Sequence, residues 1–456
     1  MSEDPASRTT PGLAAEPRVD PDRPLNPEVE AFRLESNPAK RAAMVLGPGL
    51  ITGASDDDPS GIATYAQTGA SYGYTFLWTT IVMLPMMISI QYICARIGLV
   101  TGRGLANVFR QRYPRWILYP VVLAMVVANT ANAGADIGAI AAALNMLIPV
   151  PAIVFVIPIG VVIMLVQVFG SYRQMSRIFK WLTLALLAYI GAALLSRPDL
   201  GAVLQGSLIP SFGLDAASIA ILVALLGTTI SPYLFFWQAS QEVESEIDKG
   251  RKRLWQRQGS SHTELRFALW DTVAGMTFSE IVAFFIILAT GATLHVAGKT
   301  DIQSATDAAQ ALRPIAGDAS AILLAVGLIG SGMLAVPILT ASAGYGVADA
   351  FGWKSGLDSG AQRAPHFYAV IAIATVIGVA INFLGINPIT ALVATAMLNG
   401  LLAPVILVLV MRVSSDRRVM GEHTSSRLLA SVGWVTTLVM AVGAIALIAV
   451  TVFPAL

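Results

Sequence analysis

Three consecutive carboxylates lie in the middle of an apolar segment near the start of the chain. This segment spans residues 42–74, and at its centre is the run Ser55-Asp56-Asp57-Asp58-Pro59-Ser60-Gly61. A helix should unwind here, because Pro59 lacks a backbone donor and Gly61 weakens a helix. Backbone carbonyls freed within a membrane, together with a carboxylate, are typical of a cation site. We therefore predict that Asp58 binds a cation and that Ser55, Asp56 and Asp57 line its path. For Asp56, an equally plausible role is to cap a helix that begins at Pro59.

A second small-polar run interrupts a later apolar segment, residues 216–239. This run is Gly227-Thr228-Thr229-Ile230-Ser231-Pro232-Tyr233, and it too contains a proline near the middle of the segment. It predicts a second break in a helix. An ordinary proline kink explains this run equally well, but a kink does not explain the three acids of the first segment.

A further carboxylate, Glu280, lies near the middle of the apolar segment 265–295, one turn from Thr277. An ionisable side chain at that depth predicts a function, since burying a charge in lipid is costly. We place Glu280 among the metal ligands and Thr277 beside it. The alternative is an acid bonded to a serine or threonine in a helix contact.

Amide and acid side chains also fall on one face of the segment 116–148. Asn129, Asn132 and Asp136 are spaced i, i+3 and i+7, which predicts either a wet vestibule or a contact between helices. Asn399 in the segment 390–411 and Gln238, which follows the second break, are weaker candidates of the same kind.

The composition indicates that lipid surrounds these residues. Hydrophobic residues make up 55% of the 456 residues and charged residues only 12%, against about 25% charged residues in soluble proteins. The 29 Lys and Arg nearly balance the 28 Asp and Glu, so we expect no nucleic-acid partner. One cysteine, Cys94, supports neither a disulfide framework nor a cysteine zinc site.

Eleven segments are long and apolar enough to cross a bilayer, for which about 20 residues suffice. We place them at residues 42–74, 75–99, 116–148, 152–170, 178–195, 216–239, 265–295, 319–345, 367–384, 390–411 and 428–453. Of the Lys and Arg residues, all but Arg197, Lys299 and Arg313 fall in the N-terminal tail or at the loops after even-numbered spans. This asymmetry predicts a cytoplasmic N-terminus and a C-terminus on the other side.

The predicted architecture is an all-α polytopic membrane protein. Breaks in the first and sixth spans indicate two five-helix halves, residues 42–195 and 216–411, the second inverted relative to the first. Residues 1–41 are polar, lack the apolar core of a signal peptide, and predict a disordered cytoplasmic tail. Residues 412–456 supply a cytoplasmic loop and the eleventh helix.

Several motifs within residues 44–412 resemble the Nramp family of divalent-metal transporters. They are Gly47-Pro48-Gly49, Asp58-Pro59-Ser60-Gly61, Gly73-Tyr74 and Thr101-Gly102-Arg103, followed by the broken sixth span. The resemblance implies a LeuT-like 5+5 inverted repeat with helices 1 and 6 unwound. Family members carry Asp-Pro-Gly-Asn in the first break and Met-Pro-His in the sixth, with the Asp, the Asn and the Met as metal ligands.

This chain departs from the family pattern at three positions. Asp58 and Pro59 match, but Gly61 replaces the Asn, Ser231 the Met and Tyr233 the His. In this it is similar to the Nramp-related magnesium transporters, whose implied substrate is Mg²⁺, with Mn²⁺ also carried. Mg²⁺ prefers oxygen ligands and keeps part of its water, whereas a thioether selects softer metals. We expect Asp58, Thr228 and Ser231 to hold the ion directly or through water, with Gly61 widening the site.

No histidine is predicted to lie near either break, since His262, His295, His366 and His423 fall in loops or at span ends. The resemblance implies that proton-coupled relatives use histidines in the sixth helix and an acid pair in the third. Tyr233 and Gln238 stand at the histidine positions, and Ala139 replaces one acid of the pair, leaving Asp136. We therefore predict uncoupled cation movement. The alternative is a proton-coupled Mn²⁺ or Fe²⁺ transporter in which Asp58 or Glu280 carries the proton.

Other classes of protein fit the sequence poorly. An amino-acid carrier would bind a substrate carboxylate, which three aspartates would repel. An intramembrane enzyme lacks an HExxH motif and a base at mid-membrane. We expect no cofactor, and a protein that acts as a monomer in the inner (plasma) membrane.

Overall fold

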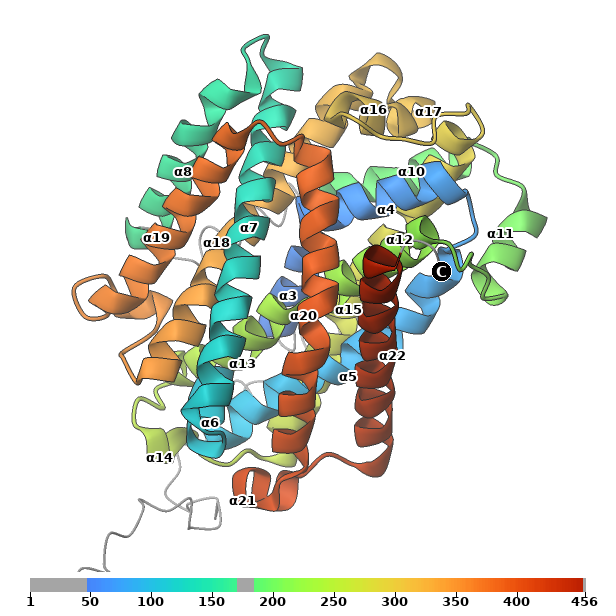
Figure 1. Ribbon diagram of the computed structural model, residues 1–456. Helices are drawn as coiled ribbons and strands as arrows, with labels where there is room; N and C mark the ends of the chain where they lie inside the picture. The colour runs from blue at the N-terminus through green and yellow to red at the C-terminus, as the bar shows by residue number, and fades with distance from the viewer. Residues whose placement is uncertain (1–46, 170–183, 454–456) are drawn as a thin grey trace, which may run out of the picture.

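The computed structural model describes residues 47–169 and 184–453, and these ranges are entirely helical and irregular, without strands (Figure 1). The predicted tail, residues 1–41, lies outside them. Eight long helices form most of the bundle: α5 (Leu77–Thr101), α7 (Arg115–Leu147), α8 (Ala152–Phe169), α15 (His262–Thr290), α18 (Ser320–Phe351), α19 (Pro365–Ile381), α20 (Pro388–Ser415) and α22 (Arg427–Val452).

Two further membrane segments are each divided into a pair of helices. The first pair is α3 (Pro48–Asp56) and α4 (Pro59–Tyr72), and the second is α12 (Ala216–Thr229) and α13 (Pro232–Asp248). The predicted fifth span, residues 178–195, lies partly outside the described ranges. Its visible part forms a 3-10 turn, Leu184–Leu187, and α10 (Ala188–Leu195).

Short helices connect the long ones. They are α6 (Leu105–Arg112), α11 (Leu200–Leu208), α14 (Leu254–Arg257), α16 (Ala305–Ala309), α17 (Arg313–Ala316) and α21 (Arg417–Met420). A π turn at Gly291–His295 extends α15, and 3-10 turns occur at Gln310–Leu312, Gly317–Ala319, Leu357–Ser359, Asn382–Leu384 and Gly421–His423.

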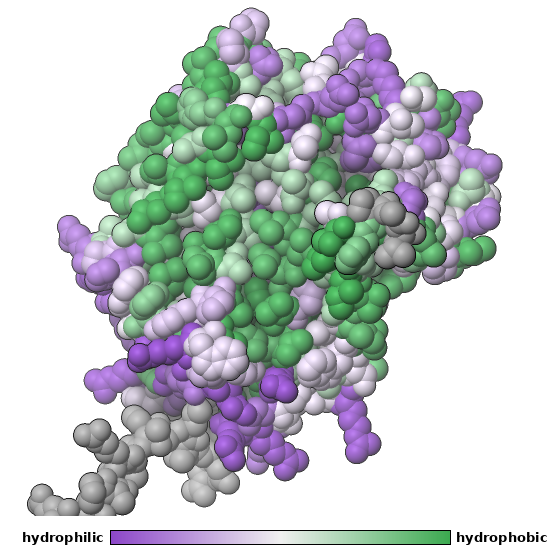
Figure 2. All heavy atoms as spheres, in the orientation of Figure 1, coloured by the Kyte–Doolittle hydropathy of each residue, from purple (hydrophilic) through white to green (hydrophobic). Residues whose placement is uncertain are grey.

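Within the described residues, nine helices are long and apolar enough to cross a membrane when α12 and α13 are taken together. A broad belt of hydrophobic side chains covers the middle of the molecule, and hydrophilic ones gather at the two ends (Figure 2). Leu438 of α22 is 63% exposed and Ile373 of α19 is 58% exposed. Such side chains on an outer face are accounted for by contact with lipid.

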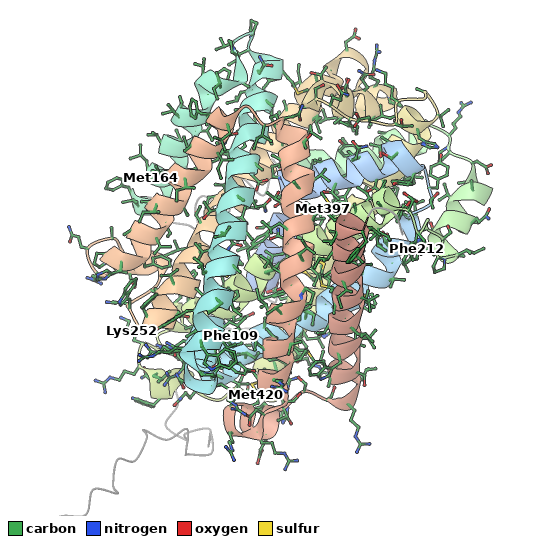
Figure 3. All side chains as sticks on the ribbon, in the orientation of Figure 1. Phe109, Met164, Phe212, Lys252, Met397 and Met420 are labelled. Carbon is green, nitrogen blue, oxygen red and sulfur yellow. The ribbon has the colours of Figure 1, made fainter. Side chains whose placement is uncertain are left out.

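Alternate connections lie at the same end of the bundle, as the predicted topology requires. Figure 3 places Phe109 of α6, Lys252 and Met420 of α21 near one end, and these residues follow the second, sixth and tenth predicted spans. The connection that contains Phe212, before the sixth span, lies away from that end. The end with Lys252 is the one that the distribution of Lys and Arg assigns to the cytoplasm, and we call it the inner end.

A very close contact between α3 and α15 fixes the first half-helix in the bundle. A Cβ atom on Gly53 would lie 2.1 Å from the backbone carbonyl oxygen of Gly275. Only glycine allows two helices to approach so closely, and backbone atoms of a packed helix cannot move aside as a flexible side chain does.

We therefore predict that Gly53→Ala lowers the thermal unfolding midpoint of the purified protein by several degrees, since overpacking costs about 1–3 kcal/mol. The matched control is Gly443→Ala in α22, where an added Cβ would lie 3.4 Å from the nearest atom, an ordinary contact. Equal midpoints for the two variants would contradict the close contact.

Candidate cation site between the broken helices

The first break is only two residues long. Asp56 ends α3, and Asp57 (φ −79°, ψ 49°) and Asp58 (φ −68°, ψ 168°) leave the helical conformation before α4 begins at Pro59. The sequence predicted a longer unwound stretch, but Ser55 remains helical and Gly61 lies in the first turn of α4. The first turn of a helix tolerates proline, because its donor there would have no partner within the helix.

The side chain of Asp58 caps α4. Its Oδ1 accepts hydrogen bonds from the backbone N–H of Gly61 and the hydroxyl of Ser60, each at 2.7 Å. Asp56 cannot have the capping role suggested as its alternative, because it is the last residue of α3. Asp58 is 1% exposed. It is thus held rigidly, with lone pairs still free on its second oxygen.

Asn132 fixes that second oxygen. Its Nδ2 donates to Asp58 Oδ2 at 3.0 Å, and its Oδ1 accepts from the Thr395 hydroxyl at 2.8 Å. Helices α4, α7 and α20 are therefore joined at the break by one buried amide. The sequence identified Asn132 by its helical face. It did not identify Thr395, which nothing in the sequence distinguishes from other membrane threonines.

A second group of carboxylates lies on the other side of the break, around Ser279 of α15. The Ser279 hydroxyl is 2.7 Å from Asp56 Oδ2 and 3.2 Å from Asp57 Oδ1. The other oxygen of each aspartate, and both oxygens of Glu280, are buried without a hydrogen-bond partner among the described residues. Charge interactions link Glu280 to Asp56 and Asp57.

Ser279 takes the place that the sequence suggested for Thr277, which is only half-buried. The residue immediately before Glu280, and not the one a turn away, is the one whose hydroxyl reaches the aspartates at the end of α3. The feature of the sequence that could have identified Ser279 is its position directly before the intramembrane acid Glu280.

The break in the sixth span is also short. Ile230 and Ser231 alone lie between α12 and α13, and Gly227 and Thr228 remain helical. The Ser231 hydroxyl lies 2.8 Å from the carbonyl oxygen of Gly227 and 2.6 Å from that of Thr228, to which it donates. The Thr228 hydroxyl is buried without a hydrogen-bond partner among the described residues. Of the two predicted ligands, Thr228 thus offers the freer oxygen.

The two breaks meet at Gly61. A Cβ atom at this position would lie 3.2 Å from the carbonyl oxygen of Asp56 and 3.3 Å from the hydroxyl of Thr228. The breaks are also bonded to each other, since the Tyr233 hydroxyl donates to the carbonyl oxygen of Ser55 at 3.1 Å. The small residue therefore leaves room between a carbonyl and a hydroxyl from two different broken helices.

The remaining predicted residues lie at different distances from this point. Asp136 is close enough to interact with the charge of Asp58. Asp136 and Asn399 are buried, and their side chains make no hydrogen bond to the described residues. Gln238 instead accepts from Thr52 at 2.6 Å and donates to Glu242 at 2.9 Å. It joins α3 to α13, and the structure shows no contact between it and Asp58.

Five carboxylates thus surround the first break, and each is at most 5% exposed: Asp56, Asp57, Asp58, Asp136 and Glu280. None forms an ion pair with a Lys, Arg or His that the structure describes. The described residues also contain no ready-made group of three or more His, Cys, Asp or Glu around one metal position. Buried charge of one sign is costly without a counterion, so this region can attract a cation without forming a closed metal cage.

A cavity of about 290 Å³ leads toward the site from the end opposite Lys252. Pro59 and Ala63 of α4 line it, together with Ala139 of α7 and Leu392 of α20. Asn129, Asn132 and Asp136 do not themselves line this cavity, although Ala139, one turn beyond Asp136 on the same face of α7, does. The wet vestibule stays a prediction. Asn129 donates to the carbonyl oxygen of Leu339 at 3.2 Å, a helix contact.

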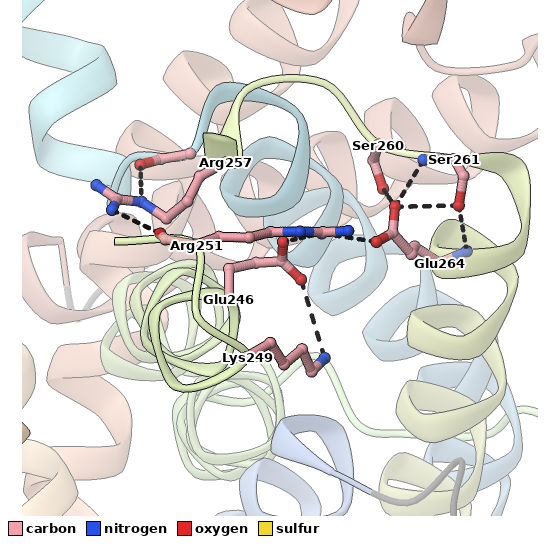
Figure 4. Close-up of polar contacts among 8 residues, drawn as sticks. Glu246, Lys249, Arg251, Arg257, Ser260, Ser261 and Glu264 are labelled. Atoms are coloured by element: carbon pink, nitrogen blue, oxygen red, sulfur yellow. Dashed lines mark hydrogen bonds and ion pairs between the residues drawn. The ribbon is translucent and has the colours of Figure 1, made fainter. Parts of the chain in front are cut away.

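The inner end is closed by polar contacts. The carboxylate of Asp271 accepts from the backbone N–H of Gly47, Gly49 and Leu50 at 2.6–3.0 Å, which holds the start of α3 against α15. Nearby, Arg251 is bonded to both Glu246 of α13 and Glu264 of α15 (Figure 4). These contacts tie α3, α13 and α15 together at the inner end, while the cavity lies at the opposite end.

Comparisons with known proteins show which proteins this chain resembles in sequence and in fold. The divalent metal cation transporter MntH of Chromohalobacter salexigens is 26% identical over 406 residues, which cover 87% of this chain and 89% of the relative. The manganese transporter of Eremococcus coleocola has the same fold, with a TM-score of 0.72 at 18% identity, over 92% of this chain and 90% of that one. Mhp1, a nucleobase-cation-symport-1 family transporter, is more distant, with a TM-score of 0.53 at 13% identity, over 89% and 91% of the two chains.

Residues 49–450 match the family described as natural resistance-associated macrophage protein-like, Nramp. The match includes both broken helices and every carboxylate of the candidate site. Since it covers most of the chain, this membrane protein belongs to the Nramp family.

Proposed function

We propose that this chain carries Mg²⁺, and Mn²⁺ as well, across the membrane by alternating access and without proton coupling. The observation that carries this proposal is the set of donors at the meeting of the two breaks. They are the Asp56 carbonyl and the Thr228 hydroxyl, which lie beside the space left by Gly61, and the Asp58 carboxylate, which accepts from the Gly61 N–H; all three offer oxygen.

Mg²⁺ fits such a site better than softer metals do. It takes oxygen ligands in an octahedral arrangement and gives up its water reluctantly. Ser231 supplies a hydroxyl where a methionine would add a thioether, and the missing side chain at Gly61 leaves room for retained water. Mn²⁺ also accepts oxygen ligands, so the same site admits it.

The positions of the histidines support the absence of coupling. The structure confirms that all four lie at helix ends or in connections: His262 begins α15, His295 ends the following π turn, His366 is the second residue of α19 and His423 lies in a 3-10 turn. Histidine is the side chain whose ordinary pKa suits proton exchange near neutrality. At the break, Tyr233 instead uses its hydroxyl to bond Ser55.

The closed inner end suggests how access alternates. Asp271 and the Arg251 cluster hold α3, α13 and α15 together there, while the 290 Å³ cavity approaches from the opposite end. The two-residue break between α3 and α4 provides a place where α3 can move separately. Opening to the inner side then requires loss of the three hydrogen bonds to Asp271.

The first prediction concerns Asp58. Asp58→Asn should reduce Mg²⁺ uptake into proteoliposomes at least about tenfold, because the ion loses its rigid anionic ligand. The variant should remain folded, since asparagine is also a good N-cap and can still cap α4.

Asp56→Asn is the matched comparison, with the same change of charge two residues earlier in the chain, on the other side of the break. We expect a much smaller loss, because Asp56 bonds Ser279 and lies in the separate carboxylate group. Near-normal uptake by a folded Asp58→Asn protein would refute the ligand assignment. Equal losses at the two positions would mean that the cluster acts as one unit.

The second prediction concerns protons. Mg²⁺ entry into proteoliposomes should leave the internal pH unchanged, and an inside-negative potential should accelerate it. Internal pH and metal content would be recorded together, with empty liposomes as the control. Proton entry that scales with metal entry, and that disappears in Glu280→Gln, would show that Glu280 couples the two ions.

The third prediction concerns selectivity. Gly61→Asn combined with Ser231→Met should lower Mg²⁺ transport relative to Mn²⁺, because asparagine fills the space between Asp56 and Thr228 and methionine adds a soft ligand. The quantity to measure is the Mg²⁺ to Mn²⁺ uptake ratio, which is insensitive to the amount of folded protein. An unchanged ratio in a folded double variant would place selectivity outside the two breaks.

A further inference from the structure

A large groove lies on the lipid-facing side of the bundle, away from the cation site. It has a volume of about 1230 Å³ and is enclosed by α5, α15, α22 and the connection before α22. Its walls are formed by residues 85–96 of α5, 262–270 of α15 and 428–432 of α22. Two of these helices begin, and the third ends, toward the inner end of the molecule.

The walls of the groove are apolar along most of its length. On α5 the lining residues run from Pro85 through Ile88 to Arg96, a distance of about 16 Å along the helix axis at 1.5 Å per residue. Trp270 of α15 and Leu428 of α22 stand opposite, 58% and 76% exposed. An exposed tryptophan at the end of a membrane helix is typical of the bilayer interface. The groove thus has the size and polarity to hold part of an acyl chain.

The inner end of the groove is positively charged. Arg96 is 8% exposed, and one of its terminal nitrogens donates to the carbonyl oxygens of His423 and Thr424 at 2.6 and 3.2 Å. Its Nε is buried and has no hydrogen-bond partner among the described residues. A buried guanidinium with an unused donor that lines a cavity favours an anionic oxygen ligand such as a phosphate, because its planar fork of N–H groups matches two oxygens.

Other basic groups converge on the same end. Arg266 and His262, on the first turns of α15, line the groove, and the ring centroids of His262 and His423 are 5.8 Å apart. Burial, together with the nearby His262 and Arg96, lowers the pKa of His423 below its ordinary value. Glu422 is the one acidic residue in the lining, against the two arginines Arg96 and Arg266. The N-terminus of α15 adds its positive dipole.

We infer that this groove binds a phospholipid with an anionic headgroup, its phosphate at Arg96 and Arg266 and an acyl chain along α5. The groove has a basic end followed by apolar walls, which matches the charged headgroup and the apolar tail of a lipid. Basic recesses between membrane helices on the cytoplasmic side are suited to such lipids. A bound lipid would also link α22 to α5 and α15. It would do so where α22 begins, next to the connection 421–427.

The test compares phosphatidylglycerol with phosphatidylcholine. The purified full-length chain, reconstituted in an equal mixture of both and then extracted, should retain phosphatidylglycerol when examined by native mass spectrometry. Arg96→Gln with Arg266→Gln should lower this retention at least tenfold. Arg115→Gln with Arg363→Gln is the matched control, because both residues are exposed, lie outside the groove and change the charge equally. This control should retain the lipid.

A second variant separates binding from folding. Arg96 also holds the connection before α22, so its loss could disturb that segment, whereas Arg266 is exposed. Arg266→Gln with His423→Ala keeps Arg96 and should still lower retention. Equal retention in the groove variants and the control would overturn the proposal, as would equal retention of phosphatidylcholine. Displacement of the lipid by millimolar inorganic phosphate would also overturn it, because an ion site would then suffice.

Discussion

The constraint on which this structure depends is that polar groups inside a bilayer must find their partners within the protein. Each helix break frees backbone groups that water cannot reach. At the first break Asp58 satisfies the N–H of Gly61, and Tyr233 satisfies the carbonyl of Ser55. At the second break, the Ser231 hydroxyl donates to the carbonyl oxygens of Gly227 and Thr228 in the preceding helix, α12. These bonds are the reason that each break is only two residues long. Few polar groups at the breaks remain without a partner. Among them is the Thr228 hydroxyl oxygen beside Gly61.

The carboxylates around the break fall into two groups with different environments. Both oxygens of Asp58 accept hydrogen bonds, while Asp56 and Asp57 share the Ser279 hydroxyl and Glu280 has no hydrogen-bond partner among the described residues. A rigid ligand is suited to defining the position of an ion, because no reorganisation is needed when the ion arrives. No described basic side chain would balance the negative charge of the less bonded group in its ionised form, so a cation nearby would favour that form. The proposed division of roles between Asp58 and the other acids follows from this difference.

Contacts far from the break decide from which side it can be reached. Asp271 and the Arg251 cluster close the inner end, and the small side chains of Ala63 and Ala139 leave a cavity at the other end. The eleventh helix takes no part in either. It packs on α12 and α20 and encloses the lipid-facing groove with α5 and α15. The helices around the candidate cation site and helix α22, which lines the lipid-facing groove, are therefore different parts of one bundle.

The sequence by itself determined the membrane class, most of the helices and the positions of both breaks, because hydropathy, proline and intramembrane acids are local properties. It also indicated Asp58, Asn132 and Glu280 as candidates, because their polarity is unusual at that depth. It did not predict that Ser279 rather than Thr277 reaches the acids, that Asp58 and not Asp56 caps α4, or that Gln238 bonds Thr52 away from the site. Only the tertiary structure decided these, because each depends on which side of a helix faces a neighbour more than 180 residues away in the chain or on where a helix begins.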